Sequence, residues 1–150
     1  MSEYQVEKIR SEVIIHLVDG QERSGVLFLS PFSPTRSGPQ TLVELLHEPE
    51  PFVPFLRSDK AFKLLNKKQI SHVQYTPGEE ENPPIGEAID VDITFINGKT
   101  LTGRTILQTP EGKGRLLDYM NSKPGYFSLD CGDSGHYLVN PRVIVEITDK

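Results

Sequence analysis

The sequence predicts an all-β protein made of two small five-stranded barrels in tandem, because one pattern of residues occurs twice along the chain. The segment 13–20 (VIIHLVDG) matches the segment 91–98 (VDITFING), and Gly25 and Gly103 follow at the same distance, so both glycine pairs lie 78 residues apart. A second set of matches has an offset of 74 residues and pairs Phe52, Phe55, Leu65, Asn66, Ile70 and Val73 with Tyr126, Leu129, Val139, Asn140, Ile144 and Ile147. A repeat this long exceeds the roughly 20–50 residues of a solenoid unit, which favours two copies of one small domain.

The repeat divides the chain into a first barrel over residues 1–75, a linker over 76–88 and a second barrel over 89–150. The linker prediction rests on the segment 76–86, in which prolines, glycines and three consecutive glutamates disfavour a packed core. Ahead of the first strand, residues 2–11 could form a short N-terminal helix, since Val6 and Ile9 lie at helical spacing.

Each unit begins with a β-hairpin. Val13, Ile15 and Leu17 alternate with other residues at the period of two that is typical of a half-buried strand. Asp19-Gly20 in the first unit and Asn97-Gly98 in the second are the dipeptides most typical of a tight hairpin turn. The glycine early in each returning strand indicates a bulge or a sharp bend.

The remaining elements follow a variable loop, which spans 30–40 in the first unit and 108–114 in the second. Residues 41–46 and 115–120 fit either a strand or a helical turn, and their place in the repeat favours a strand. Strands are expected at 52–56 and 126–129, and a closing strand is expected after an asparagine turn at Asn66 and at Asn140. About five short strands per unit are enough for a small barrel that removes its own sheet edges.

This order of elements resembles the Sm-like and SH3-like barrels. The segments LVDGQERSGVLFL (17–29) and FINGKTLTGRTIL (95–107) are similar to the opening strands of the first Sm motif, and LLNKKQISHV (64–73) and LVNPRVIVEI (138–147) stand where the second motif would lie. The asparagine-then-isoleucine ending is also similar to an uncharacterised bacterial domain family, which carries no function with it.

The Sm resemblance implies RNA binding through an aromatic or histidine side chain that stacks on a base and an asparagine that reads the base edge. The residues that would take these roles are His47, Tyr119 and Asn121, although the stretch from Asp118 to Asn121 is one residue shorter than the family spacing. The alternative is that Tyr119 is a structural position equivalent to Leu45.

Charge and composition give a second candidate surface. The chain has a net charge of −5 and lacks the basic balance of most nucleic-acid-binding proteins. One local group of cations stands out and consists of Arg57, Lys60, Lys63, Lys67 and Lys68. This group could bind an acidic protein partner or phosphate, or it could simply be a solvated turn.

Catalytic and metal chemistry are not expected. Cys131 and His136 could form a nucleophile and base in principle, and Asp130, Asp133 and His136 could hold a metal, but the glycines and aspartates around them are typical of a turn. We therefore predict no catalytic residues, no metal and no cofactor. His16 and His72 are expected on strand surfaces, beside an apolar stripe that the sister barrel would cover.

The chain is therefore predicted to be a non-enzymatic protein-interaction or scaffold module in the cytoplasm, because it has no membrane-spanning segment, no signal peptide and only one cysteine. Its partner is expected to be another protein or a further copy of itself, with no membrane association. An Sm-like RNA-binding protein is the first alternative, and a small-ligand binder or enzyme is the second.

Overall fold

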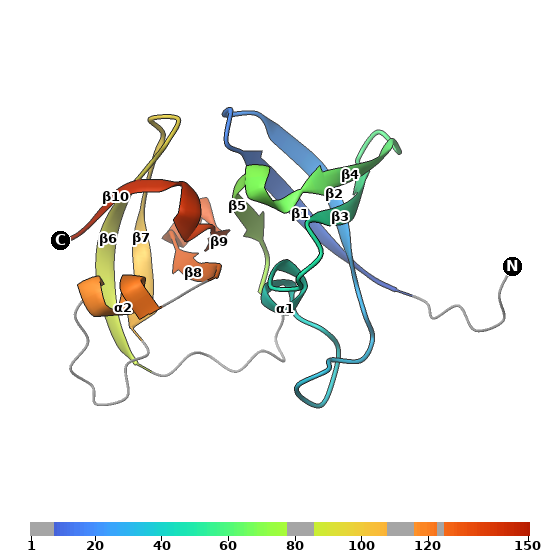
Figure 1. Cartoon of the computed structure of the whole chain (residues 1–150), viewed down its shortest axis with the longest axis horizontal. Coiled ribbons are helices and arrows are strands. Elements are labelled where there is room, and N and C mark those ends of the chain that lie inside the picture. Colours follow the sequence, from blue (N-terminus) through green and yellow to red (C-terminus); the bar gives the residue numbers. More distant parts are fainter. Residues whose placement is uncertain (1–7, 78–85, 108–115, 123–124) are drawn as a thin grey trace, which may run out of the picture.

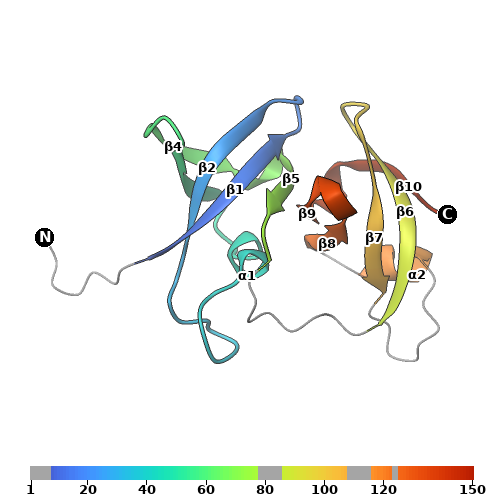
Figure 2. The same ribbon diagram turned by 180° about the vertical axis from the view of Figure 1, so that it is seen from behind.

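A computed structural model of the chain describes residues 8–77, 86–107, 116–122 and 125–150. Within these residues the protein is mostly β, and its ten strands form one antiparallel sheet that does not close on itself (Figures 1 and 2). The strand order is β10-β6-β7-β8-β9-β5-β1-β2-β3-β4. The predicted all-β character is therefore confirmed, whereas the arrangement is a single open sheet.

We call residues 9–75 the N-terminal half and residues 87–149 the C-terminal half. The first contains β1 (Ile9–Leu17), β2 (Glu22–Leu29), α1 (Leu42–Leu46), β3 (Phe52–Arg57), β4 (Phe62–Asn66), the 3-10 turn η1 (Lys67–Gln69) and β5 (Ile70–Tyr75). The second contains β6 (Glu87–Phe95), β7 (Thr100–Leu107), α2 (Leu116–Ser122), β8 (Phe127–Asp130), η2 (Gly132–Ser134), β9 (His136–Val139), η3 (Pro141–Val143) and β10 (Ile144–Asp149). In both halves the last strand pairs with the first, and the other strands follow in chain order.

Both hairpins are present, and the turn of each contains a glycine with a positive φ angle. Gly20 has φ 93° and Gly98 has φ 85°, whereas the Asp19 and Asn97 before them have negative φ angles. The carboxylate of Asp19 and the amide oxygen of Asn97 each accept a hydrogen bond of 3.0 Å from the backbone N–H two residues later. The turns are therefore three-residue loops that end in a left-handed glycine, rather than two-residue loops with two positive φ angles.

The glycine early in each returning strand allows the next strand to approach closely. A Cβ atom at Gly25 would collide with the carbonyl oxygen of Leu56 in β3. A Cβ atom at Gly103 would lie 2.8 Å from the carbonyl oxygen of Asp130 in β8. These two glycines let the sheet bend sharply where β2 meets β3 and where β7 meets β8.

Two sequence-based expectations about local structure are wrong, and one strand in each half was not expected. Residues 42–46 and 116–122 form helices rather than strands, because Leu42, Leu45 and Leu46 bury one helical face and Thr41 caps the first turn. The closing strand that was expected after each asparagine turn is present as β5 after Asn66 and as β10 after Asn140, whereas β4 and β9, which precede these turns, were not expected. The expected N-terminal helix over 2–11 does not include Ile9–Ser11, which belong to β1, and residues 1–7 lie outside the described part of the chain.

Two hydrophobic clusters form the core, one in each half. The cluster of the N-terminal half includes two residues from the other half, Tyr126 and Leu138, which are 7% and 0% exposed. In the opposite direction, Val18 packs against the cluster of the C-terminal half. Each half therefore contributes apolar side chains to the core of the other.

The long loop that follows β2 is fixed by Glu44. Its carboxylate accepts hydrogen bonds from the Ser33 hydroxyl at 2.6 Å, the Thr35 hydroxyl at 2.7 Å and the Thr41 backbone N–H at 3.0 Å, and Arg36 lies 3.7 Å away. Partial burial raises the pKa of Glu44, but hydrogen bonds from Ser33, Thr41 and Thr35 outweigh it and lower the pKa to about 2. The Thr41 hydroxyl accepts from the Glu44 N–H in return, which completes a capping box.

Glu44→Gln is expected to lower the free energy of unfolding by about 1–2 kcal/mol, because it removes a charged cap and the anchor of the loop. The folded-state pKa lies below the ordinary value of 4.5, so the stabilisation is present above pH 4.5 and is lost as the pH falls toward about 2. Urea unfolding at pH 7 measures the effect, with the exposed Glu48→Gln as the control. Equal stabilities of the two variants would contradict this account of the loop.

Candidate functional site

The two halves are joined by pairing between β5 and β9. His72, Val73, Gln74 and Tyr75 pair in antiparallel register with Val139, Leu138, Tyr137 and His136. Side-chain hydrogen bonds between described residues and backbone carbonyl oxygens also cross this boundary, from Asn140 to Ile70 at 2.9 Å, Lys99 to Gly20 at 2.9 Å, Tyr126 to Lys67 at 3.2 Å and Gln74 to Ser134 at 3.2 Å. This β5·β9 junction makes one continuous sheet of the two halves.

Stacked rings fill the centre of the junction. The His16 ring lies parallel to the His72 ring at a centroid distance of 4.2 Å, and His72 in turn stacks on Phe95 at 4.8 Å. The Tyr137 ring meets the two histidines at 6.0 and 5.5 Å. The expectation that both histidines lie on the surface is wrong for His72, which is 5% exposed because the C-terminal half covers it.

The junction favours neutral imidazoles. Burial, followed by the neighbouring His16 and Lys99, lowers the pKa of His72 to about 3. Burial also lowers the pKa of His16, although its Nδ1 lies 3.5 Å from a carboxylate oxygen of Glu22, which acts in the opposite direction. Protonating either ring would place a cation in an apolar contact, so the junction is most stable when both are neutral.

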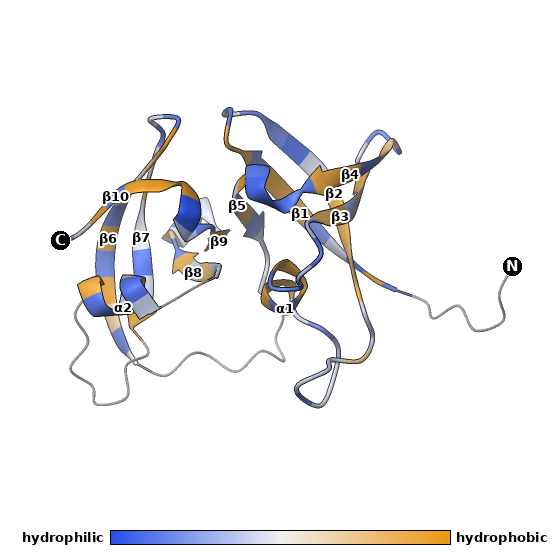
Figure 3. Ribbon diagram, viewed as in Figure 1, coloured by the Kyte–Doolittle hydropathy of each residue, from blue (hydrophilic) through white to orange (hydrophobic). Residues whose placement is uncertain are grey.

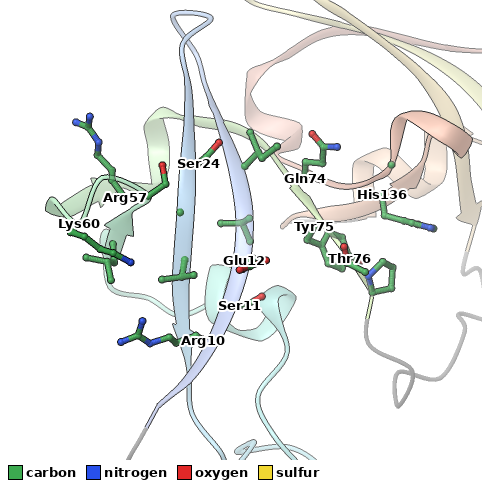
Figure 4. Close-up of a pocket in the computed structure, with 18 residues that line it drawn as sticks. Arg10, Ser11, Glu12, Ser24, Arg57, Lys60, Gln74, Tyr75, Thr76 and His136 are labelled. Atoms are coloured by element: carbon green, nitrogen blue, oxygen red, sulfur yellow. The ribbon is translucent and has the colours of Figure 1, made fainter.

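A broad groove runs along the outer face of β1 and β2. We call it the β1–β2 groove, and its volume is about 1040 Å³. Figure 4 shows Arg57 and Lys60 on one side of it and Gln74, Tyr75 and His136 on the other, with Arg10 and Glu12 along β1. Since His136 belongs to β9, the groove has walls from both halves of the chain.

The charges of the β1–β2 groove are unequal. Arg10, Arg57 and Lys60 face one carboxylate, Glu12. Arg57 forms an ion pair of 2.8 Å with Asp59, whereas Arg10 and Lys60 are exposed and form no ion pair with another described residue. The groove therefore offers a positive field to a ligand.

A second groove lies between α1 and η1, and we call it the α1–η1 groove. Its volume is about 650 Å³. Its charged and aromatic lining includes His47, Glu48, Glu50, Lys67, Lys68, Tyr126 and Arg142. The Lys67 ammonium donates a hydrogen bond to the Glu48 carbonyl oxygen, and burial lowers the pKa of this lysine against the opposing effect of Glu48 and Glu50. The ring centroid of His47 lies 6.4 Å from that of Tyr126.

The predicted site residues do not form one surface. Arg57 and Lys60 line the β1–β2 groove, Lys67 and Lys68 line the α1–η1 groove, and Lys63 lies on β4 between them. Of the residues that the Sm resemblance singles out, His47 is exposed and lies in the α1–η1 groove, whereas Asn121 is exposed on α2. Tyr119 is 5% exposed and meets Phe127 edge to face at 6.3 Å, so its ring is committed to the core.

Sequence reasoning missed the second wall of the β1–β2 groove. Gln74, Tyr75 and His136 reach it only because β5 pairs with β9, and no local pattern signals that pairing. It also left Arg142, which lines the α1–η1 groove, out of the candidate sites, although the offset of 74 aligns Arg142 with Lys68.

The turn that holds Cys131 and His136 has little to support nucleophilic chemistry. Burial and the neighbouring Asp130 raise the pKa of the Cys131 thiol, which disfavours the reactive thiolate. The His136 ring lies 3.9 Å from the Asp130 carboxylate. No cluster of three or more His, Cys, Asp or Glu side chains suited to a metal ion occurs within the described residues.

Comparisons of the chain with protein-family models, with curated proteins and with solved structures find no match. In the part of the chain that the structure describes, neither helix has the length or apolar character needed to span a bilayer. The functional argument therefore rests on the junction and the two grooves.

The stability of the protein is expected to fall as the pH drops from about 6.5 toward 3, because the unfolded chain protonates His72 in this range and the folded chain does not. The loss for this one histidine is about 2 kcal/mol at pH 5 relative to pH 8. Urea unfolding at the two pH values measures it, and His72→Phe should remove most of the difference. The control is His136→Gln, which changes a half-exposed histidine. A pH dependence that persists undiminished in His72→Phe would show that His72 is not its origin.

Proposed function

We propose that the chain is a non-enzymatic protein-interaction module, that its two halves arose from two copies of one small Sm-like or SH3-like domain, and that the β1–β2 groove is its binding site. The duplication is supported by the identical strand order of the two halves. It is further supported by equivalent turns, because Gly20 and Gly98 occupy the same place in their hairpins, and Asn66 and Asn140 each cap the turn before the last strand.

The observation that carries the proposal is the composition of the β1–β2 groove. It is open, its walls come from both halves, and its cations outnumber its carboxylates by three to one. A volume of about 1040 Å³ is slightly above the range of about 300–1,000 Å³ that is typical of small-molecule pockets. An extended acidic segment of a partner protein fits this shape and charge better than a small buried metabolite.

Binding of fluorescein-labelled acidic octapeptides, in which Asp or Glu alternates with apolar residues, tests this function by fluorescence anisotropy. The double variant Arg10→Glu/Lys60→Glu is expected to weaken binding about tenfold, because each reversal replaces a modest attraction with a repulsion. The double variant Lys68→Glu/Arg142→Glu makes the same change of net charge outside the groove and should alter the affinity less than about twofold.

Two results would contradict the proposed site. Equal weakening by Arg10→Glu/Lys60→Glu and by Lys68→Glu/Arg142→Glu would show that only net charge matters. Tighter binding of lysine-containing octapeptides than of acidic ones would show that the positive field does not select the ligand.

RNA binding is the second candidate function, and the α1–η1 groove is the observation that favours it. This groove brings His47 together with Lys67, Lys68 and Arg142, so a ring able to stack on a base lies near groups able to neutralise phosphates. Two carboxylates, Glu48 and Glu50, line the same groove and oppose a polyanion.

Filter binding of a ten-nucleotide single-stranded RNA at increasing salt separates the two functions. An RNA site requires an affinity that falls steeply with salt and a salt dependence that weakens in Lys68→Glu/Arg142→Glu. We expect instead that RNA is not retained, since Glu48 and Glu50 offset two of the three cations. Salt-sensitive retention that is lost in this double variant would establish the RNA site and displace our proposal.

A further inference from the structure

The two strands at the ends of the sheet, β4 and β10, are equivalent in the repeat to β9 and β5, the two strands that pair at its centre. Within each half the fourth strand lies at one edge and the fifth at the other. At the β5·β9 junction the fourth strand of the C-terminal half pairs with the fifth strand of the N-terminal half. The strands left at the ends are β4, a fourth strand, and β10, a fifth strand, and each pairs with a single neighbour among the described strands.

Side chains that are buried at the junction have exposed counterparts at the β4 end of the sheet, on β3 and β4. The offset of 74 aligns Tyr126 with Phe52 and Leu138 with Leu64. Tyr126 and Leu138 enter the core of the N-terminal half and are 7% and 0% exposed. Phe52 and Leu64 are 52% and 63% exposed, and Phe62 beside them is 61% exposed. The same positions are therefore filled with apolar residues in both halves but are covered in only one.

The β10 edge shows the complementary pattern. Val18 and Ser71 lie on the β5 side of the junction, in the N-terminal half. Val18 packs against the hydrophobic cluster of the C-terminal half, and Ser71 is 1% exposed. Their counterparts are Ile96, at the offset of 78, and Val145, at the offset of 74. These two residues are 56% and 62% exposed. Exposed apolar residues thus gather at both ends of the sheet, where Figure 3 shows orange segments in β4 and β10.

We propose that the chain assembles head to tail with further copies of itself, by addition of β4 of one copy to β10 of the next in the register of the β5·β9 junction. The partner is a second copy because β4 and β10 are equivalent in the repeat to β9 and β5, and β9 and β5 already pair within one chain. This assembly relies on the equivalence of the two halves and is separate from the ligand of the β1–β2 groove.

The β5·β9 register fixes the contacts of the proposed interface. Transferred by the offset of 74, it places Leu64 opposite Ile147 and Lys63 opposite Thr148, with Glu146 opposite Leu65 and Asp149 opposite Phe62. Asn66 would donate to the partner's Ile144 carbonyl oxygen, as Asn140 donates to Ile70 at 2.9 Å.

The charges of the two edges are complementary. Lys60 lies just before β4 and Lys63 lies on it, whereas Glu146 and Asp149 lie on β10. These charges favour a contact between unlike edges over a symmetric contact of β4 with β4 or of β10 with β10. A contact between unlike edges is heterologous, so successive copies form a ring if the rotation closes and a filament if it does not.

Light scattering coupled to size exclusion tests the assembly on the full chain. The wild-type protein at about 100 μM is expected to exceed the monomer mass of 16.9 kDa. Leu64→Asp on β4 and Val145→Asp on β10 should each reduce it to the monomer, because each places a carboxylate in an apolar contact. Leu117→Asp changes a residue on α2 that is 62% exposed and serves as the matched control, with no loss of assembly expected.

Mixing the two edge variants gives the decisive result. Leu64→Asp keeps an intact β10 edge and Val145→Asp keeps an intact β4 edge, so an equimolar mixture is expected to form a dimer and nothing larger. A wild-type monomer, or a mixture that stays monomeric, would overturn the proposal. If only one of the two substitutions dissociated the assembly, the contact would be symmetric and the proposal would also fail.

Two further measurements serve as controls for these results. Circular dichroism establishes that the variants are folded, and Phe62→Asp replaces Leu64→Asp as the β4 variant if the latter is not. The affinity for the acidic octapeptides is expected to stay within about twofold in both edge variants. If the wild-type protein binds the peptides but stays monomeric, only the assembly fails. If it assembles but does not bind the peptides, only the proposed function fails.

Discussion

The pairing of β5 with β9 is the interaction on which the rest of the structure depends. It makes one sheet of the two halves, supplies the second wall of the β1–β2 groove and buries His72 among His16, Phe95 and Tyr137. It also leaves β4 and β10 as the ends of the sheet. Without it, the groove would lose one side and the stacked rings would be exposed to water.

The size of the halves explains why they exchange apolar side chains. A unit of about 60 residues buries only about 60% of the surface that its unfolded chain exposes, so its own core is marginal. Tyr126 and Leu138 extend the core of the N-terminal half, and Val18 extends the other. The cost is that two imidazoles lie in the contact and must stay neutral, which makes the junction sensitive to acid.

The sequence was most informative where local chemistry decides the structure. The period-two strands and the glycine turns were predictable because alternation and positive φ angles leave local signatures. The helices were mistaken for strands because short apolar runs fit both the helical and the strand period. Thr41 and Glu44 nevertheless have the sequence pattern of a capping box, which predicts a helix start. The β5·β9 junction pairs residues more than 60 positions apart, so no local pattern could reveal it.

The candidate site was predicted only in part, for the same reason. Arg57, Lys60, Lys67 and Lys68 are neighbours in sequence, but β4 lies between the two pairs and directs them to different grooves. The residues that complete the β1–β2 groove, Gln74, Tyr75 and His136, depend on the long-range pairing. Nuclear Overhauser contacts between the backbone protons of β5 and β9 test the central claim most directly. The junction predicts cross-strand contacts between Gln74 and Tyr137 and between His72 and Val139, and their absence in the folded protein would contradict it.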